Sequence, residues 1–85
     1  MMKKNIKVCM ENGLEMRPIA NLVQIASQCN CEVQIQKGSR WVNAKSLLGM
    51  MTLDVGNGEE VEITTDGKDE RTAMDRICEF LSGVR

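Results

Sequence analysis

The chain has 85 residues, of which 42% are hydrophobic and 27% are charged, and its formal net charge is −1. This length supports one small core, so we expect a single domain over residues 1–85. No apolar run approaches the roughly 20 residues of a membrane-spanning helix, and no apolar signal-peptide core follows the basic start. The near-neutral charge disfavours nonspecific nucleic-acid binding. We expect a cytoplasmic globular protein with no direct contact to membrane or nucleic acid.

The first third of the chain predicts a strand and then a helix. Apolar Ile6, Val8 and Met10 alternate with other residues, the period-two pattern of a strand with one buried face. A loop at residues 12–13 follows. Apolar residues then recur at the three-and-four spacing of one helix face, at Ile19, Leu22, Val23 and Ala26.

A hairpin and a short helix are predicted in the middle of the chain. The segment Glu32–Gln36 alternates, Lys37–Ser39 supplies turn residues, and Arg40–Asn43 is typical of a returning strand. Ser46 is a good N-cap, because its hydroxyl can accept a hydrogen bond from an otherwise unpaired backbone N–H. A brief helix over Leu47–Leu53 is therefore predicted.

The last third predicts a fourth strand and a last helix. Val61 and Ile63 alternate with polar neighbours, and Asp66–Gly67 ends this strand. Asp69 is expected to cap the last helix, with Gly83 near its end. The apolar stripe of that helix comprises Ala73, Met74, Ile77, Phe80 or Leu81, and Val84.

The predicted order of elements is βαββαβα. Strands with one apolar face each, combined with three helices, are typical of an α/β (α+β) open-faced sandwich. In this architecture a four-stranded antiparallel sheet is covered on one face by the three helices. The other face of the sheet should contact water.

The four cysteines are Cys9, Cys29, Cys31 and Cys78, and without a signal peptide they are expected to be free thiols. Cys29 and Cys31 could begin a metal site, but the chain has no histidine and no second close cysteine pair, which disfavours zinc. We predict no metal and no cofactor. A redox role of Cys29 and Cys31 stays open, and Cys9 and Cys78 are interpreted as small apolar residues.

Three segments carry a resemblance to a known family. They are Gly13–Pro18, Asn43–Met51 and Thr65–Glu70, at mutually consistent spacings. With the length and the element order, they resemble HPr, the phosphocarrier protein of the bacterial sugar phosphotransferase system, over essentially the whole chain. The resemblance implies an HPr-like fold, and we expect no enzyme activity.

Glu15 stands where the resemblance implies the phospho-acceptor histidine of true carriers. A neutral imidazole is a nucleophile near pH 7, whereas a carboxylate brings negative charge toward an anionic phosphoryl group. Ordinary carrier chemistry is therefore not expected. Three roles remain for Glu15: an unusual acceptor that forms an acyl phosphate, a fixed charge that imitates the phosphorylated state at a helix start, or a neutral solvated loop residue.

Ser46 has a structural and a regulatory interpretation. As the residue before a short helix, it is an N-cap worth roughly 1 kcal/mol. The resemblance implies a phosphorylation site, because HPr-like proteins of low-GC Gram-positive bacteria are phosphorylated at the matching serine by an ATP-dependent kinase/phosphorylase. A phosphate adds about −1.5 to −2 charges, which the amides of a helix start can accommodate.

The other predicted anion- and partner-binding residues surround these two positions. The resemblance implies that the arginine matching Arg17 holds the phosphoryl group in carriers. Apolar residues of the short helix either belong to the core or form a contact patch. The predicted set is Glu15, Arg17, Lys45, Leu47, Leu48 and Met51.

The leading hypothesis is a regulatory HPr-like protein, similar in type to the Crh branch of the family, which has glutamine at the acceptor position. After phosphorylation of Ser46 by the HPr-type serine kinase/phosphorylase, it would bind a transcriptional regulator of the catabolite control type. The alternative is a phosphocarrier-type protein that transfers phosphoryl groups through Glu15 or binds Enzyme I without turnover. A third possibility is an HPr-like domain in an unrelated local pathway.

Overall fold

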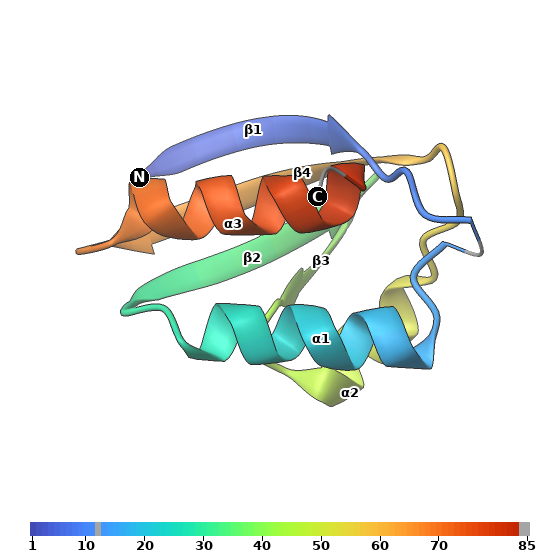
Figure 1. Cartoon of the computed structure of the whole chain (residues 1–85), viewed down its shortest axis with the longest axis horizontal. Helices are drawn as coiled ribbons and strands as arrows, with labels where there is room; N and C mark the ends of the chain where they lie inside the picture. The colour runs from blue at the N-terminus through green and yellow to red at the C-terminus, as the bar shows by residue number, and fades with distance from the viewer. Residues whose placement is uncertain (12, 84–85) are drawn as a thin grey trace.

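The structure, a computed structural model, describes residues 1–11 and 13–83. The elements follow the predicted order and form the predicted open-faced sandwich (Figure 1). The strands are β1 (Met2–Lys7), β2 (Cys31–Lys37), β3 (Arg40–Asn43) and β4 (Glu60–Gly67). The helices are α1 (Met16–Ser27), α2 (Leu47–Leu53) and α3 (Glu70–Ser82).

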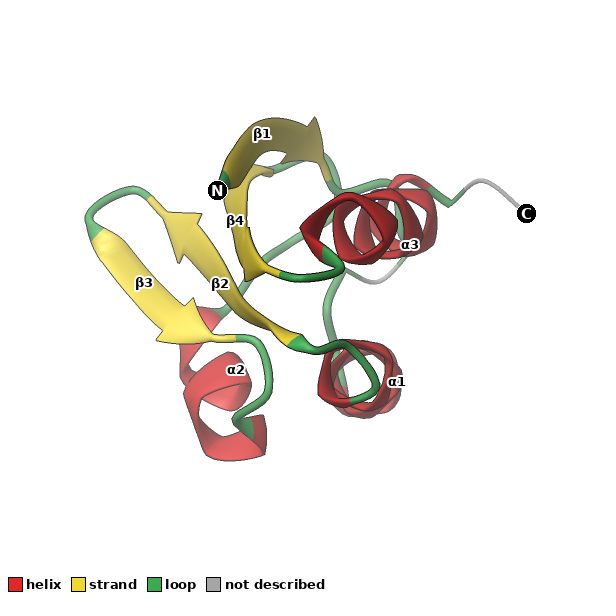
Figure 2. Cartoon of the chain, turned by 90° about the vertical axis from the view of Figure 1, so that its left-hand side faces the viewer, coloured by secondary structure: helices red, strands yellow, loops and turns green. Residues whose placement is uncertain are grey.

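The sheet has the strand order β1-β4-β2-β3, and each neighbouring pair is antiparallel. The last strand of the sequence thus lies between the first and the second. Figure 2 shows the three helices on one side of the sheet. Along β4 the residues Val61 and Ile63 face the helices and are buried, whereas the alternate positions Glu60 and Glu62 face the open side.

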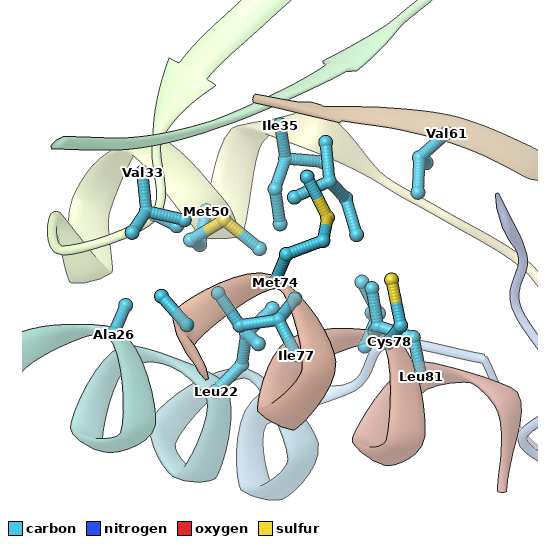
Figure 3. Packing of buried hydrophobic residues seen from close by; sticks show 14 of the residues in the cluster. Leu22, Ala26, Val33, Ile35, Met50, Val61, Met74, Ile77, Cys78 and Leu81 are labelled. Atoms are coloured by element: carbon cyan, nitrogen blue, oxygen red, sulfur yellow. The ribbon is translucent and has the colours of Figure 1, made fainter. Parts of the chain in front are cut away.

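The core lies between the sheet and the two long helices. Leu22 of α1 and Ile35 of β2 are fully buried, and Met74 of α3 reaches from the helix layer toward Ile35 (Figure 3). Fully burying a side chain of this size contributes roughly 1.5–3 kcal/mol. The predicted stripe of α3 is confirmed as far as Leu81, which is buried where Phe80 is only partly buried. Val84, predicted for the same stripe, lies outside the described residues, as does position 12 of the predicted loop.

The first strand was predicted too far along the chain. It ends at Lys7, which pairs with Glu60, the first residue of β4. Beyond this pair the Cys9 N–H donates to the Leu81 carbonyl of α3 at 2.8 Å, so the chain leaves the sheet. Val8 is fully buried, as the alternation predicted, although it lies outside the strand.

Two local predictions were wrong in their chemistry. Cys9 is exposed rather than packed as a small apolar residue, whereas Cys78 is buried as predicted. Asp69 is the N-cap residue of α3, but its side chain makes no capping hydrogen bond. Its Oδ2 instead accepts from the backbone N–H of Asn30 at 2.9 Å, so it ties the start of α3 to the turn before β2.

Candidate functional site

Glu15 is the N-cap residue of α1, and its side chain is exposed and caps nothing. The first helical hydrogen bond runs from the Ile19 N–H to the Glu15 carbonyl at 2.9 Å. The N–H groups of Met16 and Arg17 therefore have no partner inside the helix, and Pro18 has no N–H to offer. This end of α1 combines the positive end of the helix dipole with an exposed carboxylate and an exposed guanidinium.

The loop before α1 is held in place by the connection between α2 and β4. The Leu14 N–H donates to the Val55 carbonyl at 2.8 Å, and the Met10 N–H donates to Asn57 Oδ1 at 3.1 Å. Gly13 has φ +69°, and a Cβ built there would lie 2.6 Å from the Val55 oxygen. The position of Glu15 therefore depends on a backbone approach that a glycine permits.

Ser46 is the N-cap residue of α2, as predicted. Its Oγ accepts from the Gly49 N–H at 3.1 Å, and its carbonyl accepts the first helical bond from the Met50 N–H at 3.0 Å. A Cβ added at Gly49 would lie 3.3 Å from Ser46 Oγ, so this glycine leaves the hydroxyl room. The side chain is half-buried, which leaves the serine partly accessible.

The other end of α2 is held by two basic residues that were predicted only as parts of a turn and a strand. Arg40 Nη1 donates to the Thr52 carbonyl at 2.7 Å, and Lys37 Nζ donates to the Asp54 carbonyl and pairs with Glu59 at 2.6 Å. A seven-residue helix is marginal alone. Cations at its carboxyl end stabilise it by roughly 0.3–1 kcal/mol each. The only sequence signal was two basic residues flanking the hairpin turn.

Three apolar residues of α2 form an exposed surface, which we call the α2 apolar patch: Leu47, Leu48 and Met51. Their exposed fractions are 43%, 77% and 43%. Met50 and Leu53 are buried and fill the inward positions, so the core alternative for the patch was wrong. Met16 in the first turn of α1 is also 56% exposed, although it was not among the predicted contact residues.

The predicted site residues lie at separate places. Leu14 bonds to Val55, just after the carboxyl end of α2, so Glu15 lies near that end. Ser46 lies at the amino end of α2, roughly 10 Å away along the helix axis. Lys45 Nζ donates to the Cys29 carbonyl at 3.0 Å, beyond the carboxyl end of α1 and thus at the opposite end of α1 from Glu15.

Cys31 lies against Asp69, at the end of the molecule where Lys45 bonds to the Cys29 carbonyl. Burial, and then a hydrogen bond with Asp69, raise the pKa of the Cys31 thiol to about 11. The Asn30 N–H is the main cause of the lowered pKa of the Asp69 carboxyl. Among the described residues, no group of three or more histidine, cysteine or acidic side chains could hold a metal ion. Cys31 is thus a protonated, packed thiol at neutral pH.

The chain matches a known protein family over nearly its whole length. A family model described as the PTS HPr component phosphorylation site matches residues 2–83. The chain belongs to the HPr family. It is 38% identical over 81 residues to the HPr-like protein Crh of Halalkalibacterium halodurans, covering 95% of this chain and 96% of that protein. It is 35% identical over 81 residues to the HPr-like protein Crh of Bacillus subtilis, covering 95% of both.

A solved HPr structure confirms the fold. The crystal structure of a phosphocarrier protein HPr from Bacillus anthracis str. Ames superposes with a TM-score of 0.92 at 36% identity, covering 94% of this chain and 95% of that one. The chain is thus an HPr-family, Crh-like protein of the phosphotransferase-system type. Within residues 1–11 and 13–83, no helix is both long and apolar enough to cross a membrane.

Proposed function

We propose that this HPr-family protein is a regulator switched by phosphorylation of Ser46, and not a phosphocarrier. The observation that carries the proposal is the residue at the N-cap of α1. By the motif resemblance this is the acceptor position, and it holds Glu15 in a chain that contains no histidine. The similarity to two HPr-like proteins named Crh supports the regulatory class.

The surroundings of Ser46 suit a phosphate-dependent switch. Its Oγ already lies 3.1 Å from the Gly49 N–H, so a phosphate oxygen could replace the hydroxyl as the acceptor without unfolding α2. The modification adds about −1.5 to −2 charges beside the exposed α2 apolar patch. A partner that matches both the patch and the phosphate would then discriminate the two forms.

The partner we propose is a transcriptional regulator of the catabolite control type, which binds the α2 apolar patch and the phosphate together. Arg17 adds an exposed cation on the neighbouring helix start. Lys45 has a different role, because its ammonium group is bound to the Cys29 carbonyl. We assign Lys45 to positioning the segment before α2 rather than to binding the phosphate.

Phosphorylation is tested by incubating the protein with ATP and an HPr-type serine kinase/phosphorylase, followed by mass spectrometry. We expect one phosphate, which is lost in Ser46→Ala and retained in Ser39→Ala, the control on the exposed hairpin turn. Binding of the regulator should then require the phosphate. A phosphate that persists in Ser46→Ala would contradict the assignment, as would equal binding of both forms.

The second candidate function is phosphoryl transfer through Glu15 or unproductive binding of Enzyme I. It is favoured by the exposed carboxylate beside the unpaired N–H groups of α1 and by the nearby Arg17. Incubation with Enzyme I and phosphoenolpyruvate separates the candidates. An acyl phosphate that appears on the wild type and on Glu11→Gln, but not on Glu15→Gln, would establish transfer and overturn the regulatory proposal.

We propose that the negative charge of the Glu15 carboxylate, at the start of α1, imitates the phosphorylated state of a carrier. Such an anion at a helix start contributes roughly 0.3–1 kcal/mol. We expect Glu15→Gln to weaken partner binding, whereas Glu11→Gln on the same loop should not. If Glu15→Gln binds the partner with unchanged affinity, Glu15 is only a solvated loop residue. We place the protein in the cytoplasm, with its kinase and regulator, and assign it no cofactor and no enzymatic activity.

A further inference from the structure

The open face of the sheet carries a row of side chains that the proposed function does not use. The strand register pairs Asn5 of β1 with Glu62 of β4, Glu62 with Gln36 of β2, and Gln36 with Trp41 of β3. Directly paired residues point to the same face of a sheet, so these four residues cross all four strands in one line. The line is on the side away from the helices (Figure 2), because both neighbours of Glu62 along β4 are buried.

Three members of the row line a hollow of about 220 Å³. The hollow offers mainly hydrogen-bond acceptors. Gln36 Nε2 donates to the Gly38 carbonyl at 2.8 Å, which leaves the Gln36 amide oxygen for a ligand, and two carboxylates face the same space. The full lining is Asn5, Gln36, Gly38, Glu60, Val61 and Glu62.

Trp41 adds an aromatic surface next to this hollow. It is the only tryptophan of the chain, it is 59% exposed, and it is the register partner of Gln36. The two carboxylates differ in their surroundings. Glu60 is opposite Lys7 in the register, whereas Glu62 is flanked in its row by two neutral amides. Glu62 therefore has no charged residue directly opposite it on either neighbouring strand.

We propose that this row binds an arginine side chain of a partner protein. A guanidinium is planar, carries five donors and no acceptor, bonds bidentately to a carboxylate and stacks on an indole. These properties match the acceptors of the hollow, the charge of Glu62 and the exposed ring of Trp41. A neutral sugar hydroxyl would gain less than a cation from the carboxylate of Glu62, and a lysine ammonium lacks the planar fork. The surface is opposite to the helices, so it remains accessible while the α2 apolar patch is occupied.

The probe for this inference is the capped tripeptide acetyl-glycyl-arginyl-glycinamide, and the readout is the fluorescence of Trp41. We expect a saturable change that weakens with added salt, as for an exposed ion pair. The matched peptide carries citrulline, which has the same shape without the charge, and should bind at least about tenfold more weakly. Equal binding of the two peptides, or no saturable change with the arginine peptide, would overturn the proposal.

Paired variants test whether the row itself is the site. Glu62→Gln removes one charge from the row, and Glu32→Gln removes one charge from the same open face near Asp66, roughly 13 Å along β4 from Glu62. We expect Glu62→Gln to weaken the arginine peptide about tenfold, and Glu32→Gln to weaken it less than about twofold. Equal losses in both would indicate a diffuse acidic field and refute a defined site. Neither variant changes Ser46, so failure here leaves the proposed function untouched.

Discussion

Gly13→Ala tests whether the loop before α1 is fixed by its close approach to the α2–β4 connection. Gly13 has φ +69°, a conformation that costs a residue with a Cβ roughly 1–2 kcal/mol. The added Cβ would also lie 2.6 Å from the Val55 oxygen and 2.8 Å from the Gly56 Cα. Both contacts are with backbone, so the connection must shift, and overpacking of this kind costs typically 1–3 kcal/mol.

The expected loss of unfolding free energy is therefore about 2–5 kcal/mol. Gly38→Ala is the matched control, because Gly38 has φ +62° but a Cβ there meets nothing within 4 Å. It should lose only the conformational cost of roughly 1–2 kcal/mol. Small domains have unfolding free energies of about 5–15 kcal/mol, so a difference of this size between the two variants is measurable.

Urea denaturation followed by circular dichroism measures both variants against the wild type. We expect a lower midpoint at an unchanged slope, with the larger shift in Gly13→Ala. If the two alanine variants lose the same free energy, the contact with Val55 adds nothing beyond the conformational cost. The proposed dependence of the Glu15 position on this contact would then be wrong.

Three further outcomes follow from single residues. Ser46→Ala should lose about 1 kcal/mol of unfolding free energy through the missing cap. In the same denaturation assay, Ser39→Ala should stay within about 0.5 kcal/mol of the wild type. Equal losses in the two variants would contradict the cap. The folded state raises the pKa of Cys31 from 9.0 to about 11, so its stabilising contribution is complete below pH 9 and is lost between pH 9 and about pH 11. The unfolding free energy of the wild type should fall by about 2–3 kcal/mol over this range, relative to Cys31→Ala. Parallel curves of unfolding free energy against pH for the two proteins would refute this prediction. A thiol reagent should modify exposed Cys9 first, and rapid reaction of the native protein at Cys29, Cys31 or Cys78 would contradict their burial.

Local sequence patterns were enough to predict the order of elements and the start of α2. Alternation and helical spacing are local properties of side chains, so β3 and α2 have the predicted bounds Arg40–Asn43 and Leu47–Leu53. The Ser46 cap is likewise local, because the donor, Gly49, is three residues away. The motif resemblance identified the family from three short segments, each of which is a local pattern, at consistent spacings along the chain.

Which distant charged and polar groups contact each other depends on how the strands and helices pack. Lys45 bonds to Cys29 because β3 pairs with β2, and the Asp69 side chain bonds to Asn30 because β4 pairs with β2. These two pairings and the pairing of β1 with β4 put Glu62 into one row with residues of the three other strands. Periodicity tells which face a residue occupies, but register tells which residue is opposite. The turn between β2 and β3 fixes the register of that hairpin locally, but β4 pairs with two strands that are distant in the chain. Its register depends on which strand faces pack against the helices, and the pattern of β4 alone does not contain that information.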